Sequence, residues 1–327
     1  MTETPKFEID AVISWVDGDD PEHRAKRRRY GDKSVLGDDE IGGEIRYKSI
    51  GEIRYCVASL YRFAPWLRKI FIITDNQDPC LGDFISKAFP DSSISLEIVD
   101  HSVIFRGHED VLPVFDARSI ETVMWRIPGL SEHFLYLNDD FTVIAPISPE
   151  DFFVEDKVVA YGRWFSVKFS KLLRKLKPRA HGHVKASFRD SMVKAADAVG
   201  EKHFFLRLNH TPHALKVSTY ASFFGSRPDV FRKNLSFRFR DKEQFNPAEL
   251  AFLLEKQAGR LIRRPVKGNL LYLKPHGEAY MKRHIKRFTG STKEKFCCAN
   301  SLPYASPEDQ RAVLDWLESR IGVKIDL

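Results

Sequence analysis

Phe134-Leu-Tyr-Leu-Asn-Asp-Asp140 joins a short apolar run to two adjacent carboxylates. The run from Phe134 to Leu137 is typical of a buried strand, and ligands collect at strand ends in open α/β sheets. Two neighbouring acids repel each other unless a cation or strong hydrogen-bond donors offset their charge. Asp139 and Asp140 therefore indicate one of two features. One is a Mg²⁺ or Mn²⁺ site that holds nucleotide phosphates, and the other is a solvated turn.

The same pattern, a strand followed by acidic or amide residues, occurs three more times in the first hundred residues. The expected strands are 9–15, 69–74 and 96–99, and the polar residues that follow them include Asp17, Asn76 and Asp100. Segments expected to be helical alternate with the strands: a charged one at 22–30, one with helical apolar spacing at 52–63, and one at 117–126 that Pro128-Gly129 closes. This alternation predicts an α/β fold, and the four polar strand ends predict one polar cleft along one edge of its sheet.

A chain of 327 residues that is 43% hydrophobic can bury a sizeable core, as one large domain or as one domain plus an appendage, and we expect a single catalytic domain over residues 1–327. We expect an α/β core over 1–156, a basic insertion over 157–205 and a C-terminal part over 206–327 that completes the site. The sequence has a polar amino terminus, no apolar run of the ~18–20 residues that span a membrane, and four cysteines without metal-site spacing. These features predict a cytoplasmic protein.

The net charge of +7 is concentrated in two clusters, at residues 24–29 and 168–189. A basic surface attracts nucleic acid, anionic lipid or a phosphorylated substrate, and a solvated helix face is the plainer alternative. Apolar residues recur at helical spacing over 169–176 with cations between them, which predicts either a helix that rests on a membrane or an ordinary amphipathic helix. The aromatic residues are not interleaved with the cations, which argues against a nucleic-acid partner.

Two polar segments of the second half contain further candidate residues. His210 precedes Thr-Pro, whose extended geometry can aim an imidazole into a site, although a surface histidine that caps a helix has the same pattern. Residues 236–240 alternate apolar and cationic side chains, which predicts a half-buried strand with Arg238 and Arg240 on one face. Guanidiniums in this arrangement suit phosphate oxygens or an exposed strand face. Further expected elements are a helix at 247–259, a strand at 270–273 and a helix at 306–321.

Taken in order, these motifs resemble the sequence blocks of the Stealth family, the sugar-phosphate transferases of bacterial capsule synthesis and lysosomal-enzyme tagging. The first block is similar to Ile9-Asp-Ala-Val-Ile-Ser-Trp-Val-Asp-Gly-Asp-Asp-Pro21. The second resembles Gly51-Glu-Ile-Arg-Tyr55 and Ile72-Ile-Thr-Asp-Asn-Gln77, and the third, the longest, extends from Leu112 to Phe153. His210-Thr-Pro212 and Arg238-Phe-Arg240 look like its continuation, and Cys298-Ala-Asn300 resembles a degraded fourth block.

The resemblance implies a Rossmann-like (GT-A-like) mixed sheet with a nucleotide-sugar cleft and a mostly helical C-terminal part. It implies transfer of hexose 1-phosphate, GlcNAc 1-phosphate or a related sugar phosphate, from a UDP-sugar donor to a hydroxyl of a polysaccharide or oligosaccharide acceptor. UMP would leave, and Mg²⁺ or Mn²⁺ would be required. The basic segment 168–189 would associate peripherally with the inner face of the cell membrane.

The resemblance also implies roles for individual residues. Asp139 and Asp140 would bind the metal, and His210 would act as the base or contact a phosphate. Arg54 and Arg240 would hold phosphates, and Asn300 would position a phosphate or the sugar. The nucleotide pocket would be formed by Asp10, Trp15, Asp17, Asn76 and Arg238. One alternative is a metal-dependent glycosyltransferase that attacks the anomeric carbon and releases UDP. A second alternative is a basic RNA- or lipid-binding protein without catalysis.

Overall fold

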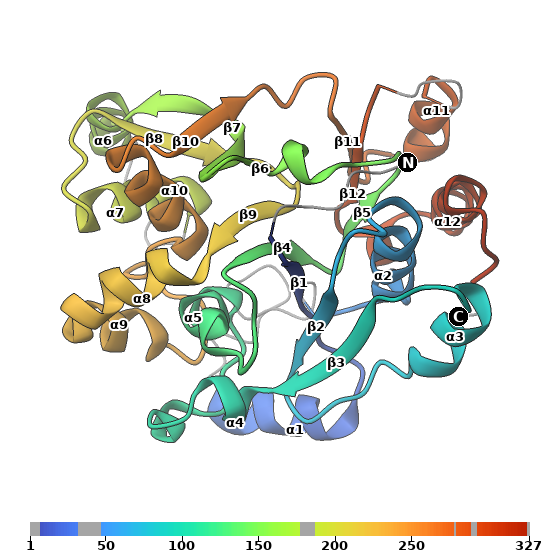
Figure 1. Ribbon diagram of the computed structural model, residues 1–327, viewed down its shortest axis with the longest axis horizontal. Helices are drawn as coiled ribbons and strands as arrows, with labels where there is room; N and C mark the ends of the chain where they lie inside the picture. Colours follow the sequence, from blue (N-terminus) through green and yellow to red (C-terminus); the bar gives the residue numbers. More distant parts are fainter. Residues whose placement is uncertain (1–6, 32–46, 177–186, 278, 289–292, 326–327) are drawn as a thin grey trace.

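The computed structural model describes residues 7–31, 47–176, 187–277, 279–288 and 293–325 (Figure 1). In this part of the chain the central sheet has the strand order β3-β2-β1-β4-β9. The first four strands are mutually parallel, and β9 pairs antiparallel with β4. The order 3-2-1-4 is that of a Rossmann sheet, so the predicted mixed α/β fold is confirmed. The strands are β1 (Ile9–Ser14), β2 (Lys69–Thr74), β3 (Ser95–Asp100), β4 (His133–Asn138) and β9 (His213–Lys216).

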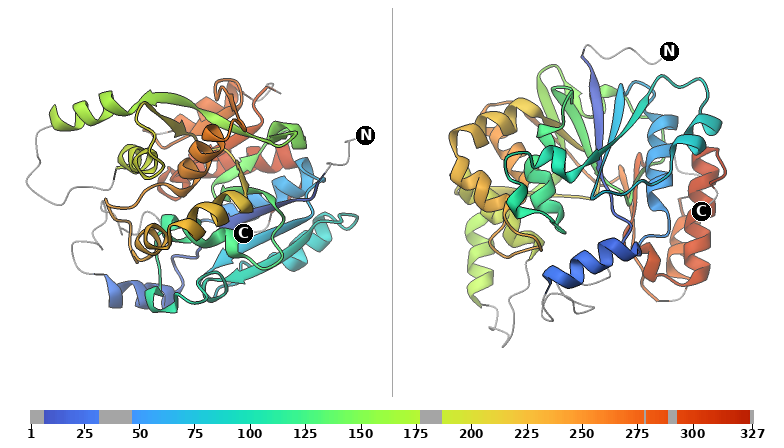
Figure 2. Two further views of the ribbon diagram at one scale, coloured as in Figure 1. Left: turned by 60° about the vertical axis from the view of Figure 1, so that its left-hand side comes forward. Right: turned by 90° about the horizontal axis from the view of Figure 1, so that it is seen from below.

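The central strands are apolar because helices cover both of their faces. Val12 in β1 and Ile72 in β2 are fully buried, as are most of their neighbours. Strands buried on both faces are expected to be nearly continuous apolar runs. Figure 2 shows α2 (Glu52–Phe63) and α12 (Pro307–Ile321) on one side of the sheet. On the other side lie α5 (Ala117–Val123), α8 (Val217–Ser226), α9 (Pro228–Leu235) and α10 (Pro247–Gln257).

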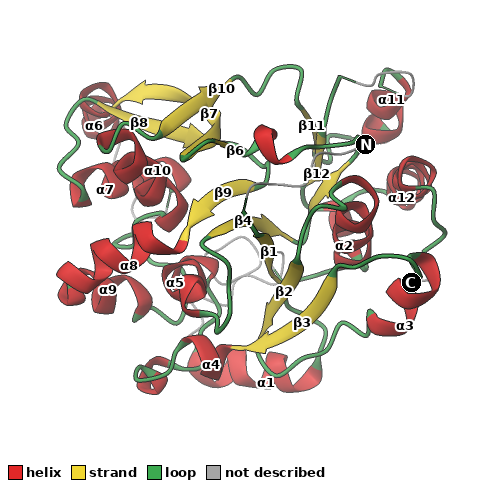
Figure 3. Cartoon of the chain, in the orientation of Figure 1, coloured by secondary structure: helices red, strands yellow, loops and turns green. Residues whose placement is uncertain are grey.

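Two smaller sheets flank the central one (Figure 3). One has the order β10-β7-β6, with β8 also paired to β7, and consists of β6 (Phe153–Val154), β7 (Lys157–Ser166), β8 (Phe204–Leu208) and β10 (Leu261–Arg264). The other has the order β11-β12-β5, from β5 (Phe141–Val143), β11 (Leu270–Leu273) and β12 (Phe296–Ala299). Since β5 follows the Asp139-Asp140 turn directly, its pairing with β12 brings a distant part of the chain beside that turn.

The remaining helices lie at the periphery of the sheets. They are α1 (Pro21–Tyr30), α3 (Gly82–Ala88), α4 (His101–Ile104), α6 (Val167–Leu176), α7 (Phe188–Ala198) and α11 (Tyr280–Lys286). Short 3₁₀ turns are formed by Glu109–Val111, Met124–Arg126, Pro149–Asp151 and Leu302–Tyr304. Within the described ranges, no helix combines the length and the apolar character needed to cross a membrane.

The strand predicted at 236–240 is wrong. These residues form an irregular segment after α9, and the two arginines have separate partners. Arg238 donates to the backbone oxygens of Asp110 and Leu112, whereas Arg240 donates to the carboxylate of Asp116. Alternation of apolar and charged residues is a pattern of strands only where a neighbouring strand supplies hydrogen bonds, and no described strand lies beside this segment.

Candidate active site

A cleft of about 500 Å³ lies at the carboxyl ends of the four parallel strands. Each strand leads into it: β1 ends at Ser14 and Trp15, β2 is followed by Asp75, β3 by His101, and β4 runs into the Asp139-Asp140 turn. The cleft is where the four polar strand ends predicted it. The amino ends of α2 and α5 also reach the cleft, with Glu52 and Ala117 in its lining.

Three segments from the second half of the chain complete the cleft. His210 lies in the turn between β8 and β9, Arg240 in the irregular segment after α9, and Asn300 directly after β12. Of the predicted site residues, those that line the cleft are Trp15, Asp139, Asp140, His210, Arg240 and Asn300. Those that lie outside its lining are Asp10, Asp17, Arg54, Asn76 and Arg238.

Asp10 and Arg238 make their contacts elsewhere in the fold and do not line the cleft. Asp10 is fully buried near the amino end of β1, where it accepts hydrogen bonds from the Arg68 guanidinium and the Ser131 amide. Arg238 donates to two backbone oxygens, and its guanidinium lies 4.9 Å from the ring centre of Tyr30. Both residues thus lie outside the cleft lining, and their place in the nucleotide pocket stays a prediction.

Arg54, Asp17 and Asn76 also have partners outside the cleft. The Arg54 guanidinium lies 5.9 Å from the ring centre of Phe84. The Asp17 carboxylate accepts a hydrogen bond from the Asp19 backbone amide at 2.9 Å. The backbone amide of Asn76 donates to the Asp100 carboxylate at 2.8 Å. Both are contacts that shape the turns after β1 and β2. The phosphate contact predicted for Arg54 and the nucleotide contacts predicted for Asp17 and Asn76 stay predictions.

Three carboxylates crowd the floor of the cleft. Burial raises the pKa of Asp139 well above its usual range, and the charges of Asp140 and Glu52 raise it further. Burial also raises the pKa of Asp140, opposed by the nearby His210. For Glu52, burial raises the pKa, while hydrogen bonds from Ser49 and the Ile50 amide, both at 2.7 Å, oppose the shift. Such crowding concentrates negative potential where a cation would be stabilised.

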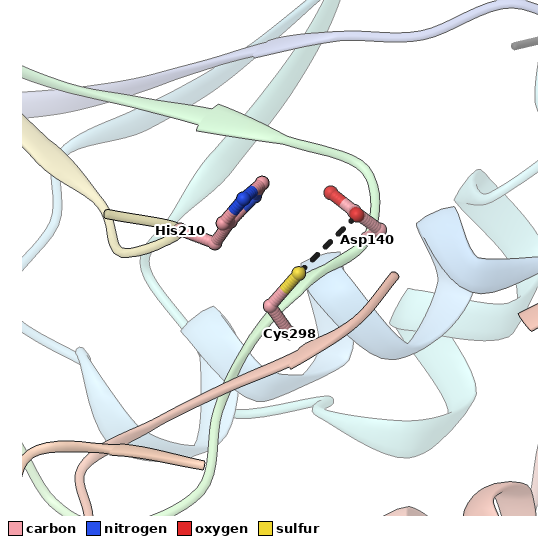
Figure 4. Close-up of side chains that lie close together, drawn as sticks. All are labelled: Asp140, His210 and Cys298. Atoms are coloured by element: carbon pink, nitrogen blue, oxygen red, sulfur yellow. Dashed lines mark hydrogen bonds between the residues drawn. The ribbon is translucent and has the colours of Figure 1, made fainter. Parts of the chain in front are cut away.

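Asp140 also belongs to a mixed group of side chains, shown in Figure 4. The Cys298 thiol donates to its Oδ2 atom at 3.3 Å, and His210 points toward the same space. One potential ligand atom from each of Asp140, His210 and Cys298 lies within 4.8 Å of the other two. Carboxylate, imidazole and thiol are all metal ligands, so these residues fit a divalent cation. Cys298 was named only as part of a sequence block and not as a ligand, because the pairing of β12 with β5 is what brings it here.

Glu121 is a further cleft residue, and it lies within the third sequence block from Leu112 to Phe153. It is 8% exposed and lies on α5. Burial and the charge of Asp116 raise its pKa to about 7, while Arg118 and Arg240 oppose the shift. The Tyr136 hydroxyl contacts one oxygen at 3.4 Å, and the other has no hydrogen-bond partner among the described residues. A buried carboxyl group with this pKa can exchange a proton at neutral pH.

Part of the cleft lining is aromatic. This part consists of Trp15, His23, Tyr47 and Phe115. The imidazole of His23 contacts the rings of Tyr47 and Phe115, with centroid distances of 5.7 and 5.4 Å. Burial and the charge of Arg27 lower the pKa of His23 to about 4, so the ring is neutral at pH 7. An apolar wall with a few polar atoms suits a planar ring, whereas the acidic floor suits a cation with phosphate.

Comparison with known proteins places these features in a family. Residues 7–35 match Stealth protein CR1 (conserved region 1), and residues 46–161 match Stealth protein CR2 (conserved region 2). An exopolysaccharide phosphotransferase of Streptomyces coelicolor is 29% identical over 95% of this chain and 54% of its own length. The capsular polysaccharide phosphotransferase WcwK of Streptococcus pneumoniae is 40% identical over 47% of this chain and 43% of its own.

The chain thus spans about half the length of the curated relatives that it matches. Among solved structures, the apo form of the bifunctional glycosyltransferase WbbM aligns with a TM-score of 0.49 and 11% identity. That alignment covers 98% of this chain and 50% of the other.

Proposed function

Because the chain belongs to the Stealth family, we propose that it transfers a hexose 1-phosphate from a UDP-sugar to a hydroxyl of a polysaccharide acceptor. GlcNAc 1-phosphate or a related sugar phosphate is the proposed group, and UMP the proposed leaving group. Relatives named as exopolysaccharide and capsular polysaccharide phosphotransferases support this class of reaction. The observation that carries the proposal is one cleft in which carboxylates, an imidazole and guanidiniums from distant parts of the chain converge.

In the proposed reaction, the acceptor oxygen forms a bond to the β-phosphorus of the donor, and the bond from that phosphorus to the bridging oxygen breaks. UMP leaves with that oxygen, and the acceptor proton passes to a base. Negative charge grows on the phosphoryl oxygens, which guanidinium donors stabilise. Arg240 and Arg118 are cations of the cleft lining in position for this role. A bound Mg²⁺ or Mn²⁺ would supply further charge neutralisation at Asp140 and Asp139.

Two cleft residues have the properties of the base. Burial lowers the pKa of His210, which keeps its imidazole neutral and able to accept a proton near pH 7. Glu121, with its pKa near 7, is the second candidate. The aromatic part of the cleft lining around Trp15 and Phe115 is proposed to receive the uracil ring, and Asn300 to position the sugar phosphate.

The leaving nucleotide tests the proposal. Purified protein is incubated with Mg²⁺ or Mn²⁺, a panel of UDP-hexoses and short capsule-type acceptors, and the released nucleotide is identified by chromatography. We expect UMP, with the donor phosphorus appearing in the product, and no release from the Asp140→Ala variant. Release of UDP would place the attack at the anomeric carbon and favour the alternative, a metal-dependent glycosyltransferase.

We also propose that α6 rests on an anionic membrane surface, at the inner face of the cell membrane, where acceptors are assembled. Phe169 and Leu172 are 59% and 52% exposed, and Lys168 and Lys171 are also exposed on this helix. Apolar side chains beside cations are complementary to anionic lipid. Residues 177–186 of the predicted basic segment lie outside the described residues.

Vesicle flotation tests this contact. We expect the protein to float with vesicles that contain phosphatidylglycerol and not with neutral phosphatidylcholine vesicles. Phe169→Ser with Leu172→Ser should abolish flotation, whereas Tyr304→Ser, which removes a 44% exposed aromatic ring elsewhere, should not. Equal flotation of the double variant would overturn the contact.

A further inference from the structure

We infer that the cleft binds a divalent transition metal through Asp140, His210 and Cys298, with the sulfur of Cys298 as a direct ligand. The sequence predicted two adjacent carboxylates as ligands and therefore a hard-oxygen site. The inferred ligand set differs in two of its members and in the metals that it prefers. It deepens the proposed function, on which the use of the metal rests, but metal binding can be measured without any substrate.

The backbone brings the three side chains together from three elements. Asp140 ends the turn after β4, His210 lies in the turn before β9, and Cys298 is in β12. Cys298 is paired with Phe141 in the antiparallel register of β12 and β5, which places its thiol beside the preceding Asp140. The Ala299 amide also donates to the Asp140 backbone oxygen at 3.3 Å. The strand pairing therefore fixes two of the three ligands relative to each other.

The spacing of the ligand atoms is close to that of a metal site. Oxygen, nitrogen and sulfur ligands at about 2.0–2.3 Å from a tetrahedral ion lie about 3.3–3.8 Å from one another. The Cys298 sulfur lies 3.3 Å from Oδ2 of Asp140, and the ligand atoms of Asp140, His210 and Cys298 all lie within 4.8 Å of one another. The rings of Tyr272 and Phe141, with centroids 5.0 and 5.8 Å away, contact the His210 imidazole and limit its orientations.

A separate observation points to a cation. The Oδ1 atom of Asp140 is buried and has no hydrogen-bond partner among the described residues. A buried carboxylate oxygen without a partner is costly, and further carboxylates at Asp139 and Glu52 add repulsion. A divalent ion would satisfy this oxygen and offset the repulsion together. With three protein ligands, one or more coordination positions stay available for phosphate oxygens.

The two adjacent cysteines provide a matched pair for an experiment. Successive side chains of a strand point to opposite faces, so Cys298 and Cys297 lie on opposite sides of β12. Cys298 faces the cleft residue Asp140, whereas Cys297 packs with Leu271 and Trp316 in a second apolar cluster. Both are almost fully buried, at 0% and 1% exposure. Replacing either by serine makes the same chemical change in an equally buried place.

A sulfur ligand affects which metal ions the site binds most tightly. Thiolate and imidazole ligands favour Co²⁺ and Zn²⁺ over Mg²⁺, which takes oxygen ligands. Co²⁺ and Zn²⁺ are therefore expected to bind this site more tightly than Mg²⁺. As a ligand, His210 could not also accept the acceptor proton, which leaves Glu121 as the base of the proposed reaction.

Cobalt is a direct probe, because thiolate ligation gives a charge-transfer absorption band in the near ultraviolet. Metal-free protein carrying Cys80→Ser, which removes the one exposed thiol of the four cysteines, is titrated with Co²⁺ alone. We expect the band in this background and in its Cys297→Ser variant, and its loss in the Cys298→Ser variant. His210→Ala should weaken Co²⁺ binding at least tenfold, and a hundredfold excess of Mg²⁺ should leave the band intact.

Absence of the band in the background protein would overturn the inference, and this outcome requires no variant to fold. Persistence of the band in Cys298→Ser, its loss in Cys297→Ser, or its displacement by Mg²⁺ would do the same. No nucleotide sugar is present in the titration. A failed titration with UMP release intact would reject the sulfur ligand alone, and a normal titration with UDP release would reject the reaction alone.

Discussion

Two acidic sites at opposite edges of the central sheet, one in β1 and the other after β4, differ in how their charge is compensated. At the amino end of the sheet, the Asp10 carboxylate accepts from two nitrogens of Arg68 and from the Ser131 amide. At the carboxyl end, Asp139 and Asp140 lie beside Glu52, and their pKa values are raised. Asp10 is the more deeply buried, yet its environment satisfies it.

The difference teaches that burial of an acid is weak evidence of function, whereas uncompensated charge is stronger evidence. A buried carboxylate whose hydrogen bonds are complete contributes to stability. Carboxylates that are held together without sufficient donors cost stability, and such sites persist where a ligand uses them. If this distinction is correct, substitutions at the carboxyl end should reduce activity and spare stability, and substitutions at the amino end should do the opposite.

The largest effect is expected for Asp140→Asn. This change should lower the rate of UMP release about 100- to 1,000-fold, the size of effect seen when a group that stabilises transition-state charge is removed. The melting temperature should stay the same or rise, because repulsion with Asp139 is relieved. Rates and thermal unfolding are compared with Asp91→Asn, which changes an exposed acid. A variant that retains more than about a tenth of the rate would contradict the assignment.

The next effect concerns Glu121 and pH. The pKa of Glu121 is about 7 in the folded protein, whereas an ordinary glutamate has a pKa of 4.5. The folded protein therefore holds the proton more tightly than the unfolded chain does. Its contribution to stability is complete below pH 4.5 and is lost as the pH rises to about 7, at ~1.4 kcal/mol per pH unit, or about 3 kcal/mol in total.

Glu121→Gln removes that pH dependence. Free energies of unfolding measured by urea titration between pH 4.5 and 8 should therefore fall less steeply for this variant than for the wild-type protein. Glu150→Gln, at an exposed position, serves as the control and should follow the wild-type curve. Parallel curves for all three proteins would show that Glu121 titrates normally and that the cleft compensates its charge.

At the amino end, Asp10→Asn should reduce the free energy of unfolding by about 1.5–3 kcal/mol, because hydrogen bonds to a charged group are lost inside the protein. UMP release per folded molecule should change less than about twofold, since Asp10 lies outside the cleft lining. Glu8→Gln is the matched control. Its carboxylate lies 3.5 Å from the same Arg68 but is 70% exposed, so its removal should cost less than ~1 kcal/mol. Equal losses for the two variants would remove the distinction based on burial.

Local patterns predicted the elements well because they depend on neighbouring residues alone. The helix at 52–63 and the strands at 69–74 and 270–273 have the predicted bounds. The predicted strand at 236–240 is wrong because alternation does not reveal whether a partner strand is present. The strand ends likewise predicted the cleft, since parallel strands bring their carboxyl ends to one edge.

The composition of the site was less predictable, because it depends on contacts between distant segments. Cys298 reaches Asp140 only through the pairing of β12 with β5, and Glu52 reaches Asp139 only through the packing of α2. The resemblance to the Stealth family implied a place in the nucleotide pocket for Asp10, which the structure places near the amino end of β1. Which end of a strand a residue occupies can be predicted from the sequence, but the partner that neutralises it, Arg68, could not.

The last comparison separates two arginines that received the same predicted role as phosphate ligands. Arg240 lines the cleft and donates to the buried Asp116 at 3.2 Å, whereas Arg54 lies outside the lining and over the ring of Phe84. Arg54→Ala should therefore lower UMP release less than about threefold, and Arg240→Ala should lower it about a hundredfold, as the loss of a phosphate contact would. A large loss for Arg54→Ala with normal thermal stability would mean that the active cleft extends along α2 beyond Glu52. The guanidinium of Arg54 would then lie close to the carboxylates of Asp139 and Asp140. It would offset more of their negative charge than the contacts described above do.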